Sequence, residues 1–334
     1  MKTINQQLAP KTGQAHVPSC RKKKKDGGEK MRQTFFGSLY LSLAASIWGG
    51  MYVVSKYVLD YVPPFTLVWL RYAIAFFVLW TILRLKRIPM PKGKNDWKPI
   101  IYIGVVGYVL SISLQFVGTK WSDAHTASLI TSATPAFIVI FARWMLHETM
   151  TMRKLSALLL ATAGVVVVVG FSEGETTSFL GNVLLVGAAV TWALLSVLVK
   201  MASARLSVLV ITTYAIFVAF IGTTPMMVWE WWEGMSKTFS FPVVLGIFYL
   251  GIVSTAGAFF LWNKGMEMMD AGVGSLFFFF QPLVGSLFGW LFLHEQLRFS
   301  FWVGGAFIVG GVVMAVLEKN GVESERQNEE KVSV

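Results

Sequence analysis

The chain alternates long apolar stretches with short polar connections, and this pattern predicts membrane-spanning helices. Each apolar run has roughly 17–25 residues, enough for a helix to cross about 30 Å of hydrocarbon. Barrel strands would have about ten residues and alternate strictly, so a β-barrel does not fit. Ten such runs lie near Phe35–Leu59, Pro64–Leu83, Pro99–Gly118, Ala124–Leu146, Leu155–Phe171, Phe179–Val199, Ser207–Trp229, Pro242–Trp262, Ala271–Leu293 and Phe299–Leu317.

The composition agrees with a chain whose solvent is lipid. Only 14% of the 334 residues are charged and 55% are hydrophobic, whereas soluble domains carry about 25% charged residues. The single cysteine, Cys20, allows no internal disulfide, and no two histidines stand at metal-ligand spacing on one helix. No GxxxxGK[ST] loop occurs, which argues against an ATP-driven pump in one chain. We therefore expect no metal and no cofactor.

The net charge of +11 has two interpretations, nucleic-acid binding or the cytoplasmic bias of a membrane protein. The positions of Lys and Arg favour the cytoplasmic bias of a membrane protein, because these residues cluster at the chain ends and between the apolar runs. We therefore expect no nucleic-acid partner. The link Arg84–Asp96 holds five basic residues, and the positive-inside rule places it in the cytoplasm. This orientation predicts a multi-pass plasma-membrane protein with both termini cytoplasmic.

The two ends of the chain differ from the rest. Residues 1–33 are polar, contain the basic run Arg21–Lys25 and lack periodicity, which predicts a disordered cytoplasmic tail without a cleavable signal peptide. Met31 opens the segment MRQTFFG, and we interpret residues 1–30 as dispensable. Residues 319–334 are predicted to form a second polar cytoplasmic tail.

The chain also matches itself. At an offset of 147, Leu146-His147-Glu148 returns as Leu293-His294-Glu295 and Pro135 returns as Pro282; at an offset of 144, Trp48 returns as Trp192. We expect two five-helix repeats, 34–172 and 179–318. Because five is odd, the second would insert upside down relative to the first. Inverted repeats are a recurrent transporter architecture with substrate bound near the midplane. The predicted fold class is an all-α membrane protein, ten transmembrane helices as two inverted five-helix repeats.

Two segments carry a family resemblance: DAHTASLITSATPAF…LHETMTMRKLSALLLATAGVVVVV and WNKGMEMMDAGVGSLFFFFQPLVGSLFGWLFLHEQLRFSFWVGGAFIVGGVV. They resemble the ten-helix EamA-type branch of the drug/metabolite transporter superfamily, with a proline inside the fourth helix of each half, a glutamate at its end and a glycine-rich fifth helix. Trp48 and Arg71 stand where that family often has Trp and Arg. Gln281 departs from it, because relatives often have Glu there. The resemblance implies transport of amino acids, amphipathic metabolites or drugs, often outward.

Polar and aromatic residues within the apolar runs are the candidate binding residues. An unpaired charge such as Arg71 near mid-span costs about 2.5–3.5 kcal/mol on insertion scales. It either faces the bundle interior, where it could bind a carboxylate, or snorkels to the headgroups. Small and polar stripes on the first and third helices turn toward protein or a cavity. A further such stripe stands at the offset of 147 from the third helix: Gly251, Thr255, Ala258, Trp262 and Gly265. We predict one central cavity lined by Trp48, Tyr52, Tyr108, Gln115, Trp192, Trp262 and Gln281, with Arg71 near its outer part.

Other residues are assigned structural roles. Pro135 and Pro282 belong to the repeated fourth helix. Glu148 and Glu295 end that helix in each half, and each is expected to accept backbone N–H bonds at the start of the next helix, with proton coupling as the alternative. Gly285 and Gly289 form a GxxxG motif, typical of close helix contact within a chain or in a homodimer.

We expect a secondary transporter, an exporter of a small organic metabolite, amino acid or drug-like solute, working by alternating access. The alternatives are a nucleotide-sugar-like carrier, a non-transport membrane receptor or assembly factor, and a lipid-modifying enzyme. An enzyme should show clustered His, Asp or Glu at one membrane face, and the sequence has none, so no enzyme activity is expected. Proton coupling is predicted to be weak or absent, because the titratable residues lie near span ends or in links.

Overall fold

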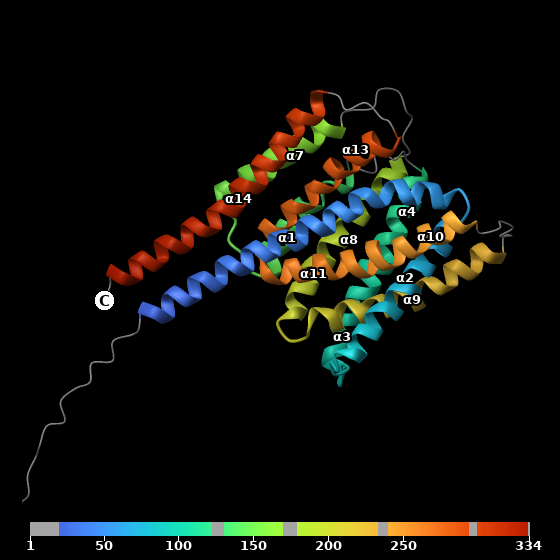
Figure 1. The fold of residues 1–334 in the computed structure, drawn as a ribbon, viewed down its shortest axis with the longest axis horizontal. Helices are drawn as coiled ribbons and strands as arrows, with labels where there is room; N and C mark the ends of the chain where they lie inside the picture. The colour runs from blue at the N-terminus through green and yellow to red at the C-terminus, as the bar shows by residue number, and fades with distance from the viewer. Residues whose placement is uncertain (1–19, 122–129, 170–178, 233–239, 294–298, 333–334) are drawn as a thin grey trace, which may run out of the picture.

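The computed structural model of the protein describes residues 20–121, 130–169, 179–232, 240–293 and 299–332. Every regular element in these ranges is a helix (Figure 1), and no strand occurs among them. In chain order they are α1 (Cys20–Leu59), α2 (Pro64–Leu85), α3 (Lys94–Tyr102), η1 (Ile103–Ser111), α4 (Ile112–Trp121), α6 (Thr134–Met145), α7 (Met152–Val169), α8 (Phe179–Ser203), α9 (Val208–Trp232), α10 (Phe241–Tyr249), η2 (Leu250–Gly257), α11 (Ala258–Met268), α12 (Ala271–Ser275), η3 (Leu276–Phe279), α13 (Phe280–Leu293) and α14 (Phe299–Val332).

Within the described ranges, seven helical stretches are long and apolar enough to cross a membrane: Pro64–Leu85, Lys94–Gly118, Phe179–Ser203, Val208–Trp232, Phe241–Met268, Ala271–Phe288 and Phe299–Leu317. The all-helical, multi-span prediction is therefore confirmed. The other three predicted runs coincide with α1, with the shorter apolar helix α6 and with α7. The count of ten spans and the inverted arrangement stay predictions.

Local chemistry sets the ends of α2, the helix that carries Arg71. Pro64 opens it, and proline suits the first helical turn because that turn needs no backbone donor. Arg84 lies in the last turn, where a cation interacts favourably with the helix dipole. Arg87 then adopts a positive φ of 52°, the left-handed conformation that commonly ends a helix.

Two of the long helical stretches, Lys94–Gly118 and Phe241–Met268, are wound irregularly at their centres. Between α3 and α4 the chain forms the π-helix η1, and between α10 and α11 it forms the π-helix η2. Their first residues, Ile103 and Leu250, are separated by the offset of 147 that the sequence repeat shows. Wide turns of this kind are rare and are often found at functional sites.

The fourth helix is interrupted just before each repeated proline. Pro135 lies in the first turn of α6, after a turn at Ser132 and Ala133, and Pro282 lies near the start of α13, after the 3-10 segment η3. Both prolines thus lie inside the helical segment that follows the interruption, Pro135 in α6 and Pro282 in α13. Proline lacks the backbone N–H that a helix interior requires, so the regular helix restarts around it.

Close helix contacts recur with the sequence repeat. A Cβ added to Gly118 would lie 2.9 Å from Leu185 Cγ, and one added to Gly265 would lie 2.5 Å from Leu41 Cγ. Helices α7 and α14 cross at Gly164 and Gly304, where an added Cβ would come within about 2.6 Å of the other glycine's carbonyl oxygen. The two halves thus use equivalent residues to pack equivalent helices.

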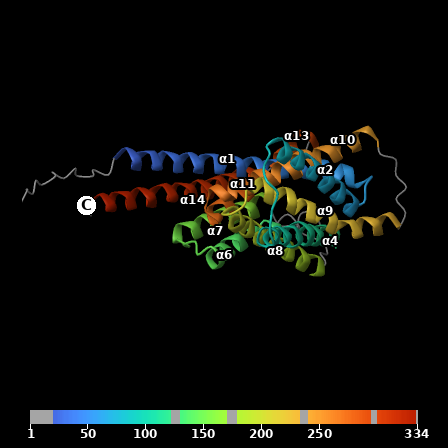
Figure 2. The same ribbon diagram turned by 90° about the horizontal axis from the view of Figure 1, so that it is seen from below.

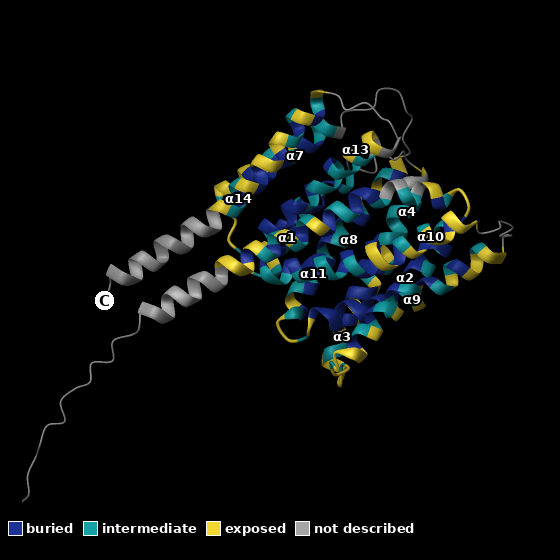
Figure 3. Ribbon diagram, viewed as in Figure 1, coloured by how far each residue is buried: buried dark blue, intermediate teal, exposed yellow. Residues whose placement is uncertain are grey.

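Buried residues fill the centre of the bundle, and exposed ones follow its outer helices (Figure 3). Both α1 and α14 extend beyond the bundle in the same direction, as the two perpendicular views show (Figures 1 and 2). The first and last described residues therefore lie on the same side of the molecule.

Candidate functional site

Tryptophans from both halves meet in the middle of the bundle. The rings of Trp48 on α1 and Trp192 on α8, equivalent positions in the sequence repeat, are 5.5 Å apart and nearly perpendicular. Trp262 on α11 lies 5.4 Å from Trp48. Trp48 is 4% exposed and Trp262 is fully buried, so these indoles face protein and not lipid.

Further aromatic rings complete this group. Tyr108 on η1 stacks on Phe259 of α11 at 4.7 Å, and Phe259 also contacts Trp192 at 5.6 Å. Phe278 on η3 lies 5.5 Å from Trp262. We call these six residues the aromatic cluster: Trp48, Tyr108, Trp192, Phe259, Trp262 and Phe278.

Polar side chains tie the cluster to its surroundings. Trp48 Nε1 donates to the Ser254 carbonyl at 3.0 Å, and Trp262 Nε1 donates to Ser196 Oγ at 3.2 Å. The amide of Asn263 donates to Tyr108 Oη at 3.1 Å. Among the buried side-chain nitrogens and oxygens of the described ranges, only Trp192 Nε1 lacks a hydrogen-bond partner. Such an orphan donor is uncommon in folded proteins.

Arg71 lies beside the aromatic cluster and is 8% exposed. Its Nε donates to Thr255 Oγ1 at 3.0 Å, and its Nη2 donates to Ser254 Oγ at 3.4 Å and to Met51 Sδ at 3.3 Å. Ser254 joins the two parts of the site, because its carbonyl binds Trp48 and its hydroxyl binds Arg71. No carboxylate of the described residues lies within 4.0 Å of the guanidinium.

The π-helix η2 explains why two hydroxyls point at Arg71. Thr255 Oγ1 donates to the carbonyl of Leu250, five residues earlier, at 2.7 Å, a spacing that suits the wider turn. The same oxygen keeps lone pairs free to accept from Arg71. The widened turn therefore presents Ser254 and Thr255 together to helix α2.

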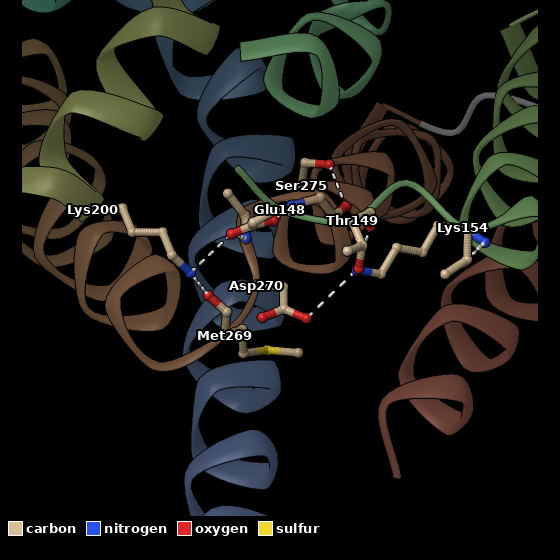
Figure 4. Close-up of polar contacts among 10 residues, drawn as sticks. Glu148, Thr149, Lys154, Lys200, Met269, Asp270 and Ser275 are labelled. Atoms are coloured by element: carbon tan, nitrogen blue, oxygen red, sulfur yellow. Dashed lines mark hydrogen bonds and ion pairs between the residues drawn. The ribbon is translucent and has the colours of Figure 1, made fainter. Parts of the chain in front are cut away.

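A second polar group joins the two halves at a face formed by helix ends (Figure 4). Glu148, which follows α6, accepts from the backbone N–H groups of Ala271 at 2.8 Å and Gly272 at 3.1 Å, at the start of α12. Lys200 near the end of α8 lies 3.4 Å from the Glu148 carboxylate and also donates to the Met269 carbonyl.

Lys154 extends this group. It lies 3.6 Å from the Asp270 carboxylate and donates to the Thr149 carbonyl at 3.1 Å. We call Glu148, Lys154, Lys200 and Asp270 the Glu148 cluster. It fastens the link between α6 and α7 of the first half to the ends of α8 and α12 in the second (Figure 4).

The predicted cavity residues divide into two sets. Trp48, Tyr108, Trp192 and Trp262 come together in the aromatic cluster, with Arg71 linked to them through Ser254. The Tyr52 side chain lies outside the described residues. Gln115 on α4 and Gln281 on α13 are half-buried, and their role in a cavity stays a prediction.

The sequence reasoning missed several residues of the site. Asn263 and Ser254 are polar residues inside an apolar run, and that signal could have identified them. Phe259 and Phe278 had no such signal, because an aromatic residue in a span is equally expected in a packed core. Thr255 belonged to a small and polar stripe but was not assigned a partner.

The structural predictions have mixed outcomes. Glu148 accepts backbone N–H bonds at a helix start, as expected, but the helix is α12 and not the next one, α7. A carboxylate satisfies backbone donors wherever packing brings a helix start within reach. Gly285 lies against Gly49 of α1, a helix contact within the chain. Glu295 and the surroundings of Gly289 lie outside the described residues.

The candidate site has no sign of a metal centre. In the described part of the chain no three His, Cys, Asp or Glu side chains gather closely enough to hold an ion. What the arrangement offers instead is flat aromatic surface, an unpaired indole donor and one buried cation.

Comparison with known proteins places this site in a transporter context. The model of the EamA-like transporter family matches residues 35–170 and again 179–317. The "Uncharacterized transporter YetK" of Bacillus subtilis is 27% identical over 92% of this chain and 95% of its own length. The "S-adenosylmethionine/S-adenosylhomocysteine transporter" of Chlamydia muridarum is 27% identical over 81% of this chain and 87% of its own.

A solved crystal structure shares the fold. It superposes with a TM-score of 0.72 at 22% identity and covers 86% of this chain and 98% of the solved chain. Since the family model matches most of the chain in two consecutive copies, the protein is a membrane transporter that belongs to the EamA-like transporter family.

Proposed function

We propose that this protein is a secondary transporter that moves a small organic solute by alternating access between two inverted five-helix halves. The observation that carries the proposal is the aromatic cluster, because equivalent residues of the two halves, Trp48 and Trp192, meet at its centre. A site shared by two repeats is exposed to one side or the other when the repeats rock against each other. The recurring glycine contacts, such as Gly118 and Gly265, support the same two-fold relation.

The Glu148 cluster supplies a closed face in this scheme. It joins the two halves through an ion pair, two helix-capping bonds and a lysine–carbonyl bond. On the predicted topology these helix ends are cytoplasmic, together with both termini. The described conformation would then be closed toward the cytoplasm, and opening would require Glu148 to release α12.

The proposed solute is an amino acid, another metabolite or a drug-like compound, moved outward across the plasma membrane. The relative from Chlamydia muridarum is named for two adenosyl compounds, which supports a small organic solute here. A nucleotide-sugar-like carrier is the second candidate within transport. It is less favoured, because the buried cation beside the cluster is the single residue Arg71, whereas a diphosphate carries at least two negative charges.

Reconstitution tests the proposal directly. The purified full chain is placed in liposomes loaded with amino acids, nucleosides and S-adenosylhomocysteine, and the released compounds are identified by mass spectrometry. We expect selective release of one or a few compounds, lost on Trp192→Ala. Trp229→Ala, at a residue 58% exposed at the surface, is the matched control and should transport normally.

Liposomes that release nothing above the protein-free background would count against transport. Release that survives Trp192→Ala unchanged would instead remove the aromatic cluster from the pathway. A pH gradient imposed at zero membrane potential should change the rate little, since no Asp, Glu or His is expected within the membrane centre.

A further inference from the structure

We infer that the central site binds a solute that carries a carboxylate on a flat, apolar body, with Arg71 receiving the carboxylate and the aromatic cluster receiving the body. This inference rests on the proposed transport function and specifies its substrate class. Three observations carry it: a buried cation without an anion, unsatisfied donors, and aromatic rings contributed by both halves.

The first observation is the charge. Arg71 lies in a span, is 8% exposed and has no carboxylate partner among the described residues. Arginine stays charged at any ordinary pH. Its described partners are two hydroxyls and a thioether, which stabilise the cation but do not neutralise it. Ionisable groups inside a membrane protein mark substrate or ion pathways by default.

The second observation is the set of unsatisfied donors. A guanidinium has five N–H groups arranged as a fork. The described contacts use Nε once and Nη2 twice, through Thr255, Ser254 and Met51, so none of them engages Nη1. The unpaired Nε1–H of Trp192 adds another donor. Carboxylates accept from several donors at once and bind arginine with two parallel hydrogen bonds.

The third observation is the apolar surface. Trp48 contacts Trp192, Phe259, Trp262 and Phe278 within ring-centroid distances of 5.4–6.2 Å. Two of these contacts are edge-on and two are tilted. Planar groups bind to such rings in offset or edge-to-face arrangements. Separation of the halves would part Trp48 from Trp192 and open a slot suited to a flat ring.

Geometry joins the cation to the rings. The carbonyl of Ser254 holds Trp48 and its hydroxyl holds Arg71. A solute whose carboxylate displaced the weak contacts at 3.3–3.4 Å from Arg71 Nη2 would have its apolar body directed along Ser254 toward Trp48.

Three simple probes separate the parts of this inference: phenylacetate, with ring and carboxylate; phenethylamine, with the ring and a cation; and acetate, with the carboxylate alone. Saturable change in the tryptophan fluorescence of the purified full chain reports binding. We expect phenylacetate to bind, and phenethylamine and acetate to bind at least tenfold more weakly.

Variants test the assigned roles. Arg71→Gln should weaken phenylacetate binding at least tenfold, and Trp192→Phe, which keeps a ring but removes the N–H, should weaken it several-fold. Arg71→Lys should recover part of the loss, because it restores the charge without the fork. Arg84→Gln is the matched control: it removes an exposed arginine of the same helix, stacked over Trp80, and should bind as the wild type does.

The outcomes are distinct. Equal binding of phenethylamine, unchanged phenylacetate binding in Arg71→Gln, or no saturable response to phenylacetate would each overturn the carboxylate assignment. Thermal unfolding of each variant without probe identifies a folding defect, and Arg71→Lys then carries the test. If phenylacetate binds but the liposomes described above release no solute, the result supports the binding site and contradicts the proposed transport function.

Discussion

Replacing Glu148 by Gln tests whether the Glu148 cluster holds one face of the protein closed. The substitution keeps the size of the side chain but removes the charge paired with Lys200. It also replaces one of the two oxygens that accept from Ala271 and Gly272 by an NH₂ group, which can only donate. Glu148 and Lys200 are only 15% and 19% exposed, so solvent screens the pair weakly. A charge-assisted bond and a partly buried ion pair together contribute about 3 kcal/mol.

If these bonds exist only in the closed state, their loss raises the open population by roughly a hundredfold, since about 1.4 kcal/mol corresponds to a factor of ten. Val273 reports opening, because it is 1% exposed and lies just behind the capped N–H groups of α12. With the native Cys20 changed to Ser, Val273→Cys should react with a maleimide up to a hundredfold faster in the Glu148→Gln background. The labelling rate follows the open fraction when opening and closing are fast.

The matched control is Glu267→Gln. Glu267 pairs with Lys264 three residues away on α11, so its charge joins no separate elements, and labelling of Val273→Cys should not change. A reporter at Ile216 on α9, fully buried elsewhere in the bundle, should stay unreactive in both backgrounds. Unchanged labelling in Glu148→Gln, or an equal rise at Ile216→Cys, would refute the idea of local opening; the second result would indicate general destabilisation.

Three more predictions follow from single features. Gly304→Ala should lower the melting temperature by several degrees, because its Cβ would lie 2.5 Å from the Gly164 carbonyl oxygen, whereas Gly93→Ala, with open space around it, should be neutral. Trp48→Phe should lower the free energy of unfolding by about 1–3 kcal/mol, because the buried Ser254 carbonyl loses the indole N–H that donates to it. Unchanged thermal unfolding would contradict this prediction. Lys92→Cys, in the predicted cytoplasmic link, should resist impermeant thiol reagents in intact cells, and ready labelling there would reverse the proposed topology.

The membrane-helical fold could be predicted because lipid imposes a simple rule. Each span must satisfy its backbone internally and present apolar side chains, so long apolar runs such as Val208–Trp232 identify the helices. The wide turns of η1 and η2 could not be predicted, since an apolar sequence looks alike whether its backbone hydrogen bonds span four residues, as in an α-helix, or five, as in a π-helix. Their matching positions become meaningful only when the hydrogen bonds are known.

The candidate site was partly predictable for a different reason. The sequence repeat identified Trp48 and Trp192 as equivalent residues. If the two repeats are related by a two-fold axis, as predicted, equivalent residues close to that axis lie close to each other. Nothing local in the sequence ties Glu148 to Ala271, which lies 123 residues away. Likewise, Arg71 meets Ser254 across 183 residues because α2 crosses η2. Contacts that depend on how helices cross are not visible in the period of one helix.

The two π-helices carry a mechanical consequence. A π-turn holds one residue more than an α-turn, so moving that surplus residue along a helix rotates every side chain between its old and new positions by about 100°. Tyr108 lies inside η1, and Ser254 and Thr255 lie inside η2. Migration of either surplus residue would rotate these groups away from the rings and from Arg71, while the intervening segment moved along the helix axis by only about 1.5 Å and the span kept its length. The stretches Lys94–Gly118 and Phe241–Met268 thus each contain a position about which part of the helix can rotate, at the level of the aromatic cluster and Arg71.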